Sequence, residues 1–244
     1  MTHRFFVGHV PDEEAVLDGE QSRQIATVLR LQPGEHIIVI AGGREHEVEL
    51  TAVAPGMVTG RVTERREVLT EPPFRITLAL PLLRGDRSEE IIEAASQLGV
   101  SRFVPFMSSR SVVKELSGAK LERWRRIARE SAETARRGAV PEIDSAVAWD
   151  ALADRLPGTV LVCWEEAREP HLGSLRVKGD CSLVIGPEGG LAAAEVKLLT
   201  ARGARAVSLG PRNLRAETAA IAAVSIAVAG METGGVVEGA ACPL

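Results

Sequence analysis

The pattern of apolar and polar residues predicts two structurally different parts of the chain. Between residues 35 and 67, short apolar runs alternate with the turn pairs Gly42-Gly43 and Pro55-Gly56. This alternation is typical of a small β-barrel or sheet. Ahead of it, Ile25, Val28 and Leu29 recur at helical spacing and predict a short helix over 22–31. The apolar runs of the sheet are 36–41, 45–53 and 57–62.

A stiff segment, Glu71-Pro72-Pro73, separates this first part from the rest of the chain. Beyond it the pattern changes to strands that alternate with long helices. We therefore predict a domain boundary there, with one domain over residues 1–72 and a second over 73–244.

The second part has the pattern of an open α/β domain. Its later strands are continuous aliphatic runs, as expected for parallel strands buried on both faces. Asp86 and Glu89 resemble a capping box at the start of a helix that ends at Gly99. The predicted strands are 74–80, 102–106, 159–163, 181–185 and 206–209, and the other predicted helices are 119–137, 191–202 and 218–231.

Composition narrows the possible function classes. The chain of 244 residues is 45% hydrophobic and 25% charged, which is ordinary for a globular protein, and with 3% aromatic residues it has few base-stacking platforms. Its cysteines, Cys163, Cys181 and Cys242, match neither a disulfide framework nor a zinc pattern, and its five histidines lack metal-ligand spacing. The apolar segment 218–231 is too short to cross a bilayer. We expect a cytoplasmic protein with no metal and no membrane association.

Charge is unevenly distributed along the chain. The formal net charge is −4, yet residues 84–137 carry 12 Lys and Arg against 8 Asp and Glu. Arginine suits bidentate contacts with phosphate. A basic face that binds nucleic acid and a compositional bias of the genome explain this excess equally well.

Three loops that follow predicted buried strands are the places where chemistry is expected, because ligands of open α/β sheets bind at the carboxyl ends of strands. These loops are 81–87, 186–190 and 210–218. Gly186, Gly189 and Gly190 would let the backbone approach a ligand closely, or would simply make a tight turn. Neither the dinucleotide-binding pattern nor the P-loop pattern is present.

In the third loop, Arg215 and Glu217 place a cation and a carboxylate at the start of the last helix. Such a pair can bind a polar substrate and accept a proton. An ion pair that only caps the helix fits the same residues.

Two motifs together carry a resemblance to a known family: IGPEGG at 185–190 and LGPRNLRAETA at 209–219. They are similar to those of the SPOUT (α/β-knot) methyltransferases, and more narrowly the chain resembles the RsmE family of 16S ribosomal RNA uridine-N3 methyltransferases. HRFFV at 3–7, VLRL at 28–31 and GDR at 85–87 extend this resemblance over nearly the full length.

The resemblance implies an N-terminal PUA-like β-barrel that binds RNA and a C-terminal α/β domain threaded into a trefoil knot. It implies S-adenosylmethionine as cofactor, a homodimer, and 16S rRNA of the assembled small ribosomal subunit as substrate. By carry-over, the cofactor is contacted by Gly186, Pro187, Gly189, Gly190, Leu209, Gly210 and Leu214.

The reaction needs removal of the proton from uridine N3, and a base flipped out of its stack. Glu217 or Glu188 is the expected proton acceptor, and Arg215 the group that stabilises negative charge on the uracil oxygens. The expected RNA contacts are Arg84, Arg87, Arg123, Arg126, Arg136 and Arg137.

The chain departs from the family pattern at a few positions. Arg84 stands where a lysine is usual, Thr134-Ala135 where Gln-Ser is usual, and Asn213 where an aliphatic residue is usual. These departures bear on substrate recognition more than on the cofactor site. The rival functions are ribose 2′-O-methylation on the same fold and a non-catalytic RNA-binding role in ribosome assembly.

Overall fold

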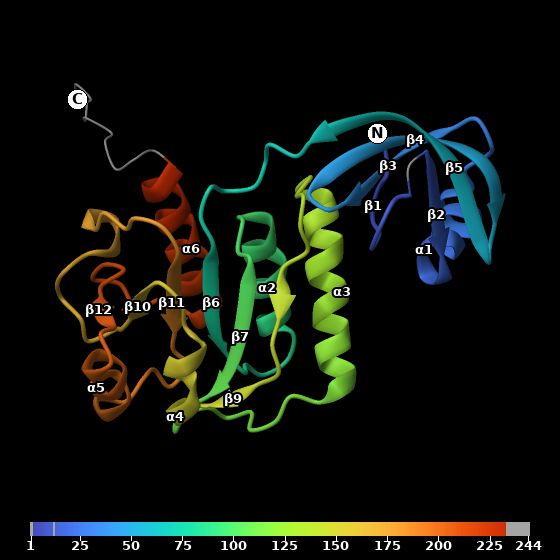
Figure 1. Ribbon diagram of the computed structural model, residues 1–244. Helices are drawn as coiled ribbons and strands as arrows, with labels where there is room; N and C mark the ends of the chain where they lie inside the picture. Colours follow the sequence, from blue (N-terminus) through green and yellow to red (C-terminus); the bar gives the residue numbers. More distant parts are fainter. Residues whose placement is uncertain (1, 12, 233–244) are drawn as a thin grey trace, which may run out of the picture. The chain divides into compact units, whose positions relative to one another are not determined.

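The computed structural model describes residues 2–11 and 13–232 (Figure 1). Cys242 lies outside these described residues. The chain forms two compact units. One comprises Met1–Glu71 together with Ala132–Val140, and the other comprises Pro72–Ser131 together with Pro141–Leu244.

The first unit is a curled five-stranded sheet with the strand order β1-β3-β4-β5-β2. β1 runs parallel to β3, and the other neighbours are antiparallel. Among the described strands β2 does not pair with β1, so the sheet is a half-barrel. Its elements are β1 (Arg4–Phe6), β2 (Glu14–Asp18), α1 (Gly19–Arg23), the π-helical segment η1 (Gln24–Leu29), β3 (His36–Ala41), β4 (Arg44–Ala54) and β5 (Met57–Glu67).

Local sequence explains the curl of this sheet. Gly42 and Gly43 both have positive φ, as the two-residue turn between β3 and β4 requires. β4 carries two register shifts against β5, and such bulges bend a strand. Position 60 requires a residue without a side chain, because a Cβ there would lie 2.4 Å from a methyl group of Val48 in the bent strand β4. The three predicted strands are confirmed.

The second unit is an α/β sandwich around a parallel sheet with the order β12-β10-β11-β6-β7-β8, to which β9 adds by pairing with β7. Its strands are β6 (Ile76–Pro81), β7 (Arg102–Met107), β8 (Glu142–Ile143), β9 (Val147–Ala148), β10 (Thr159–Cys163), β11 (Cys181–Ile185) and β12 (Arg205–Val207). Its helices are α2 (Arg87–Gln97), α3 (Gly118–Thr134), which continues into the first unit, α4 (Trp149–Leu152), η2 (Ala153–Arg155), η3 (Leu172–Ser174), α5 (Ala193–Ala201) and α6 (Ala216–Glu232).

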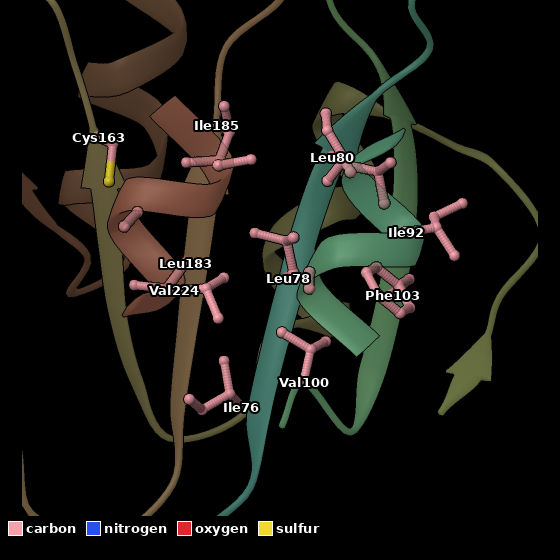
Figure 2. Packing of buried hydrophobic residues seen from close by; sticks show 14 of the residues in the cluster. Ile76, Leu78, Leu80, Ile92, Val100, Phe103, Cys163, Leu183, Ile185 and Val224 are labelled. Carbon is pink, nitrogen blue, oxygen red and sulfur yellow. The ribbon is translucent and has the colours of Figure 1, made fainter. Parts of the chain in front are cut away.

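Both faces of this sheet are buried, which confirms the sequence-based prediction. On one face, Leu78, Leu183 and Ile185 pack with Ile92 of α2 and Val224 of α6 (Figure 2). The other face packs against α4 and α5 through residues such as Val184, Val196 and Leu199. The alternation along each strand sends successive side chains into these two cores.

Two details at helix ends differ from the sequence-based predictions. Asp86 precedes α2 but its side chain makes no capping hydrogen bond. The helix expected over 119–137 ends at Thr134, because Arg136 adopts φ +57° and the amides of Arg136 and Arg137 bond back to the carbonyls of Glu133 and Ala132. This is the Schellman pattern, with arginine at the position that favours glycine.

Candidate functional site

A cavity of about 880 Å³ lies at the carboxyl ends of the parallel strands β10, β11 and β12. This volume is within the range of small-molecule sites. Three loops line it: the segment after β10, the turn Gly186–Gly190 after β11, and the segment Leu209–Ala216 that leads into α6. Arg87, at the start of α2, completes the lining.

The turn Gly186–Gly190, called the cofactor loop below, is shaped by its glycines. The amide of Gly190 donates a hydrogen bond to the carbonyl oxygen of Pro187 at 2.8 Å, and Gly190 has φ +71°. The carboxylate of Glu165 occupies the space beside it, since a Cβ on Gly190 would lie 1.7 Å from the Glu165 Oε1 atom. The φ angle thus favours glycine at this position, and a side chain there would displace the neighbouring carboxylate.

The segment after β12 brings apolar and charged groups to the same cavity. Gly210 has φ +109°, and its amide donates to the Ser208 hydroxyl at 3.1 Å. Leu209 and Leu214 line the cavity together with Ile185. This combination of aliphatic side chains and open backbone suits a flat, partly polar ligand.

All seven residues expected to contact the cofactor line this cavity. Glu188 and Arg215, expected in catalytic roles, line it as well. Glu217 is not among the lining residues; it lies in the first turn of α6, and its Oε2 atom is buried without a hydrogen-bond partner among the described residues. The structure therefore separates the two carboxylates that we considered as proton acceptors.

Glu188 is engaged in an ion pair in this structure. Its Oε1 atom lies 3.2 Å from Nη1 of Arg87, and about a third of each side chain is exposed. Arg87 is thus tied to the cofactor loop, whereas Arg84 is exposed and is not among the residues that line the cavity.

The loop after β10 also lines the cavity, through Trp164, Glu165 and Arg168, and none of these was predicted from the sequence. The signal was present, because 159–163 was predicted as a parallel strand and ligands bind at the carboxyl ends of such strands. Without a glycine-rich motif, this loop did not stand out from the sequence.

The arginines of residues 84–137 are used in several different ways. Arg126 is exposed on α3, while Arg123 pairs with the buried carboxylate of Glu89 at 2.7 Å. Arg136 is exposed beyond the end of α3. Because Arg123 already has a protein partner, it is less available to phosphate than its position on the sequence suggested.

Arg137 was expected to contact RNA phosphate, but its side chain is buried and already paired. It is 2% exposed, and its guanidinium makes two hydrogen bonds to the Glu71 carboxylate, at 3.1 and 2.8 Å. Burial alone would raise the pKa of Glu71, but the hydrogen bonds from Arg137 and from the amides of Gly138 and Ala139 lower that pKa below its ordinary value. Arg137 therefore has a structural role within the first unit.

The described residues show no cluster of His, Cys, Asp and Glu that could hold a metal ion. Within the same residues, no helix is both long and apolar enough to cross a membrane. Cys163 lines the cavity, and burial raises the pKa of its thiol to about 12. This thiol is therefore protonated near neutral pH and is a poor nucleophile.

Comparison with known proteins gives the family. Residues 70–228 match the model of the RNA methyltransferase domain. The chain is 36% identical to the ribosomal RNA small subunit methyltransferase E of Mycobacterium bovis, covering 94% of this chain and 91% of that protein. It is 34% identical to the Bacillus subtilis protein of the same name, covering 86% and 87%. The chain belongs to the ribosomal RNA small subunit methyltransferase E (RsmE) family.

Two solved structures match the architecture of both units. The RsmE protein of Neisseria gonorrhoeae, solved bound to S-adenosylmethionine, matches with a TM-score of 0.84 at 27% identity over 96% of this chain and 98% of that one. A Legionella pneumophila protein in complex with the same cofactor matches with a TM-score of 0.84 at 28% identity, over 95% and 98%. The RsmE chain described here thus has a half-barrel unit followed by a SPOUT-like parallel-sheet unit.

Proposed function

We propose that this protein transfers a methyl group from S-adenosylmethionine to N3 of a specific uridine in the decoding region of 16S rRNA. The observation that carries the proposal is the cavity built by three strand-end loops, in a chain of the RsmE family. The assembled small subunit is the proposed substrate and the cytoplasm the proposed location. Two copies of the chain act as a homodimer, and the knot implied by the resemblance remains a prediction.

The residues present fit this cofactor. Ile185, Leu209 and Leu214 offer aliphatic contacts for an adenine ring, and the glycine-rich backbone offers amides and carbonyls close to the ligand. Glu165 adds a carboxylate that fills the space above Gly190 and can accept hydrogen bonds from ligand hydroxyl or amino groups.

S-adenosylmethionine, when bound, supplies an electrophilic methyl group. The chain must then hold uridine N3 in line with that methyl group and remove one proton. Arg215 lines the cavity and stabilises the negative charge that spreads onto the uracil carbonyl oxygens. Glu188 lines the same cavity, and a shift of Arg87 away from it would free its carboxylate to accept the proton.

Glu217 is the alternative proton acceptor. Its buried Oε2 atom lacks a hydrogen-bond partner among the described residues, which leaves it able to accept a proton or a hydrogen bond from a donor that enters the site. Substitution distinguishes the two carboxylates. The acceptor's Gln variant should slow single-turnover methylation at least tenfold with unchanged cofactor affinity, while Glu93→Gln, an exposed position on α2, should not. Wild-type rates in both Glu188→Gln and Glu217→Gln would contradict this acid–base scheme.

Contacts to RNA phosphate are proposed for the exposed arginines Arg84, Arg126 and Arg136, with smaller contributions from Arg87 and Arg123. Since phosphate contacts release counterions, RNA affinity should fall as salt is raised. A flat salt dependence would remove this part of the proposal.

The test is a methylation assay with labelled S-adenosylmethionine and small subunits that lack the modification, followed by mass spectrometry of the nucleosides. We expect 3-methyluridine in 16S rRNA, and more of it on assembled subunits than on naked RNA. Label in a ribose methyl group would instead indicate 2′-O-methylation. Cofactor binding without any transfer would indicate a non-catalytic RNA-binding role.

A further inference from the structure

A neighbouring segment, residues 108–111, follows β7 and contacts the cofactor loop. It is called the β7 loop below. The β7 loop has its own internal support. The amide of Ser108 donates to the Ser111 hydroxyl at 2.9 Å, and Nζ of Lys114 donates to the Ser108 carbonyl oxygen at 3.2 Å. Both serines are buried. These hydrogen bonds therefore fix the conformation of the β7 loop, which contacts its neighbours.

Glu195 connects the β7 loop to the segment that follows the cofactor loop. This α5 residue is 9% exposed, and its carboxylate accepts hydrogen bonds from the amide of Ser109 at 2.7 Å and from the amide of Ala192 at 2.8 Å. Hydrogen bonds to an ionised acceptor are stronger than neutral ones. One buried carboxylate thus connects the β7 loop to the residues that follow Gly190.

Arg110 makes the second connection, and it reaches the cofactor loop directly. Its Nη1 atom donates to the carbonyl oxygen of Gly189 at 3.0 Å. Its side chain also packs on Gly189, because a Cβ at that position would lie 3.2 Å from Cβ and 3.7 Å from Cδ of Arg110. Gly189 has no positive φ that would require glycine. Its lack of a side chain is instead explained by the close approach of Arg110.

We propose that Arg110 is a positioning residue for the cofactor loop. Arg110 donates a hydrogen bond to the Gly189 carbonyl oxygen and packs on the Gly189 backbone. It thereby fixes the turn that contains the hydrogen bond from the Gly190 amide to the Pro187 carbonyl oxygen. Arg110 is not among the residues that line the cavity, so it acts on the ligand through this loop. The identity of the ligand, S-adenosylmethionine, rests on the proposed function.

The test compares Arg110→Ala and Arg110→Lys with wild type, and Arg155→Ala is a matched control at an exposed arginine of η2. Hydrogen exchange of the peptide over 186–192 reports on the loop without any ligand. We expect Arg110→Ala to speed exchange there about tenfold and to weaken S-adenosylmethionine binding about fivefold, with the melting temperature and the rate at saturating cofactor nearly unchanged. Arg110→Lys keeps one donor, so it should retain most of the slow exchange and most of the cofactor affinity of the wild type. Arg155→Ala should match the wild type in both.

Unchanged exchange over 186–192 in Arg110→Ala would overturn the inference, whatever the protein binds. An equal loss in Arg110→Lys, or a general loss of stability that accounts for both readouts, would overturn it as well. If exchange rises in Arg110→Ala while the wild-type protein does not bind S-adenosylmethionine, the positioning role stands and the proposed function fails.

Discussion

The cavity depends on positions that lack a side chain, whereas the arginine-rich segment 84–137 depends on long charged side chains. Several residues that line the cavity are glycines, and its shape depends on φ angles at Gly190 and Gly210 and on missing side chains. The arginine-rich segment works through long side chains, several of which are already paired with carboxylates, as in Arg123 with Glu89. The first region should therefore be sensitive to added atoms, and the second to removed charges.

The strongest expected effect is that of Arg137→Ala. It would leave the partly buried Glu71 carboxylate without its guanidinium partner, so we expect a loss of about 3 kcal/mol in the free energy of unfolding. Urea denaturation measures it. Arg126→Ala, an exposed position on the same basic segment, should stay within about 0.5 kcal/mol of wild type. Equal stabilities of the two variants would contradict the structural role of Arg137.

Gly190→Ala should be next in size. Alanine there would have to adopt φ +71°, and its methyl group would displace the Glu165 carboxylate from its position beside residue 190. We expect S-adenosylmethionine affinity to fall about fivefold or more, because backbone strain and displacement cost roughly 1–3 kcal/mol, with the first unit unaffected. Calorimetric titration gives the affinity. Gly118→Ala, where a Cβ meets nothing within 4 Å, is the control and should bind normally.

A smaller effect should come from pH. The pKa of Glu71 is lowered in the folded protein, so its ion pair with Arg137 stabilises the fold above the ordinary carboxyl pKa. That stabilisation is lost as pH falls through the lowered pKa. The difference in unfolding free energy between wild type and Glu71→Gln should therefore be largest at about pH 7 and should shrink steadily as the pH is lowered toward about 3. A difference that stays constant between these values would argue against the pair.

Arg136→Gly should separate RNA binding from stability. Its φ of +57° favours glycine, so this substitution should leave the fold unchanged or stabilise it by up to about 1 kcal/mol. If Arg136 contacts phosphate, RNA affinity should fall about twofold to threefold and the salt dependence should become shallower. Filter binding at several salt concentrations measures both, and unchanged affinity would remove Arg136 from the RNA contacts.

Sequence reasoning succeeded where structure depends on local pattern. The strands 159–163 and 181–185 were predicted with their observed bounds, because continuous aliphatic runs indicate burial on both faces. The loops that follow 181–185 and 206–209 were predicted to form the site, and both line the cavity. Here glycine and proline show directly where the backbone turns.

It failed where structure depends on partners far along the chain. Arg137 pairs with Glu71, 66 residues away, and nothing near either residue indicates that pairing. The grouping of 132–140 with the first unit and the two-residue strands β8 and β9 are likewise tertiary features. Glu165 is an intermediate case, since the strand before it was predicted but no motif distinguished the loop in which it lies.

We propose above that the three strand-end loops form the S-adenosylmethionine site. A crystal structure of the protein grown with this cofactor tests the claim most directly. We expect density for the whole cofactor in the cavity between the cofactor loop and Leu209–Ala216, with Glu165 within hydrogen-bond distance of it. Cofactor density elsewhere on the protein, with this cavity filled only by solvent, would contradict it.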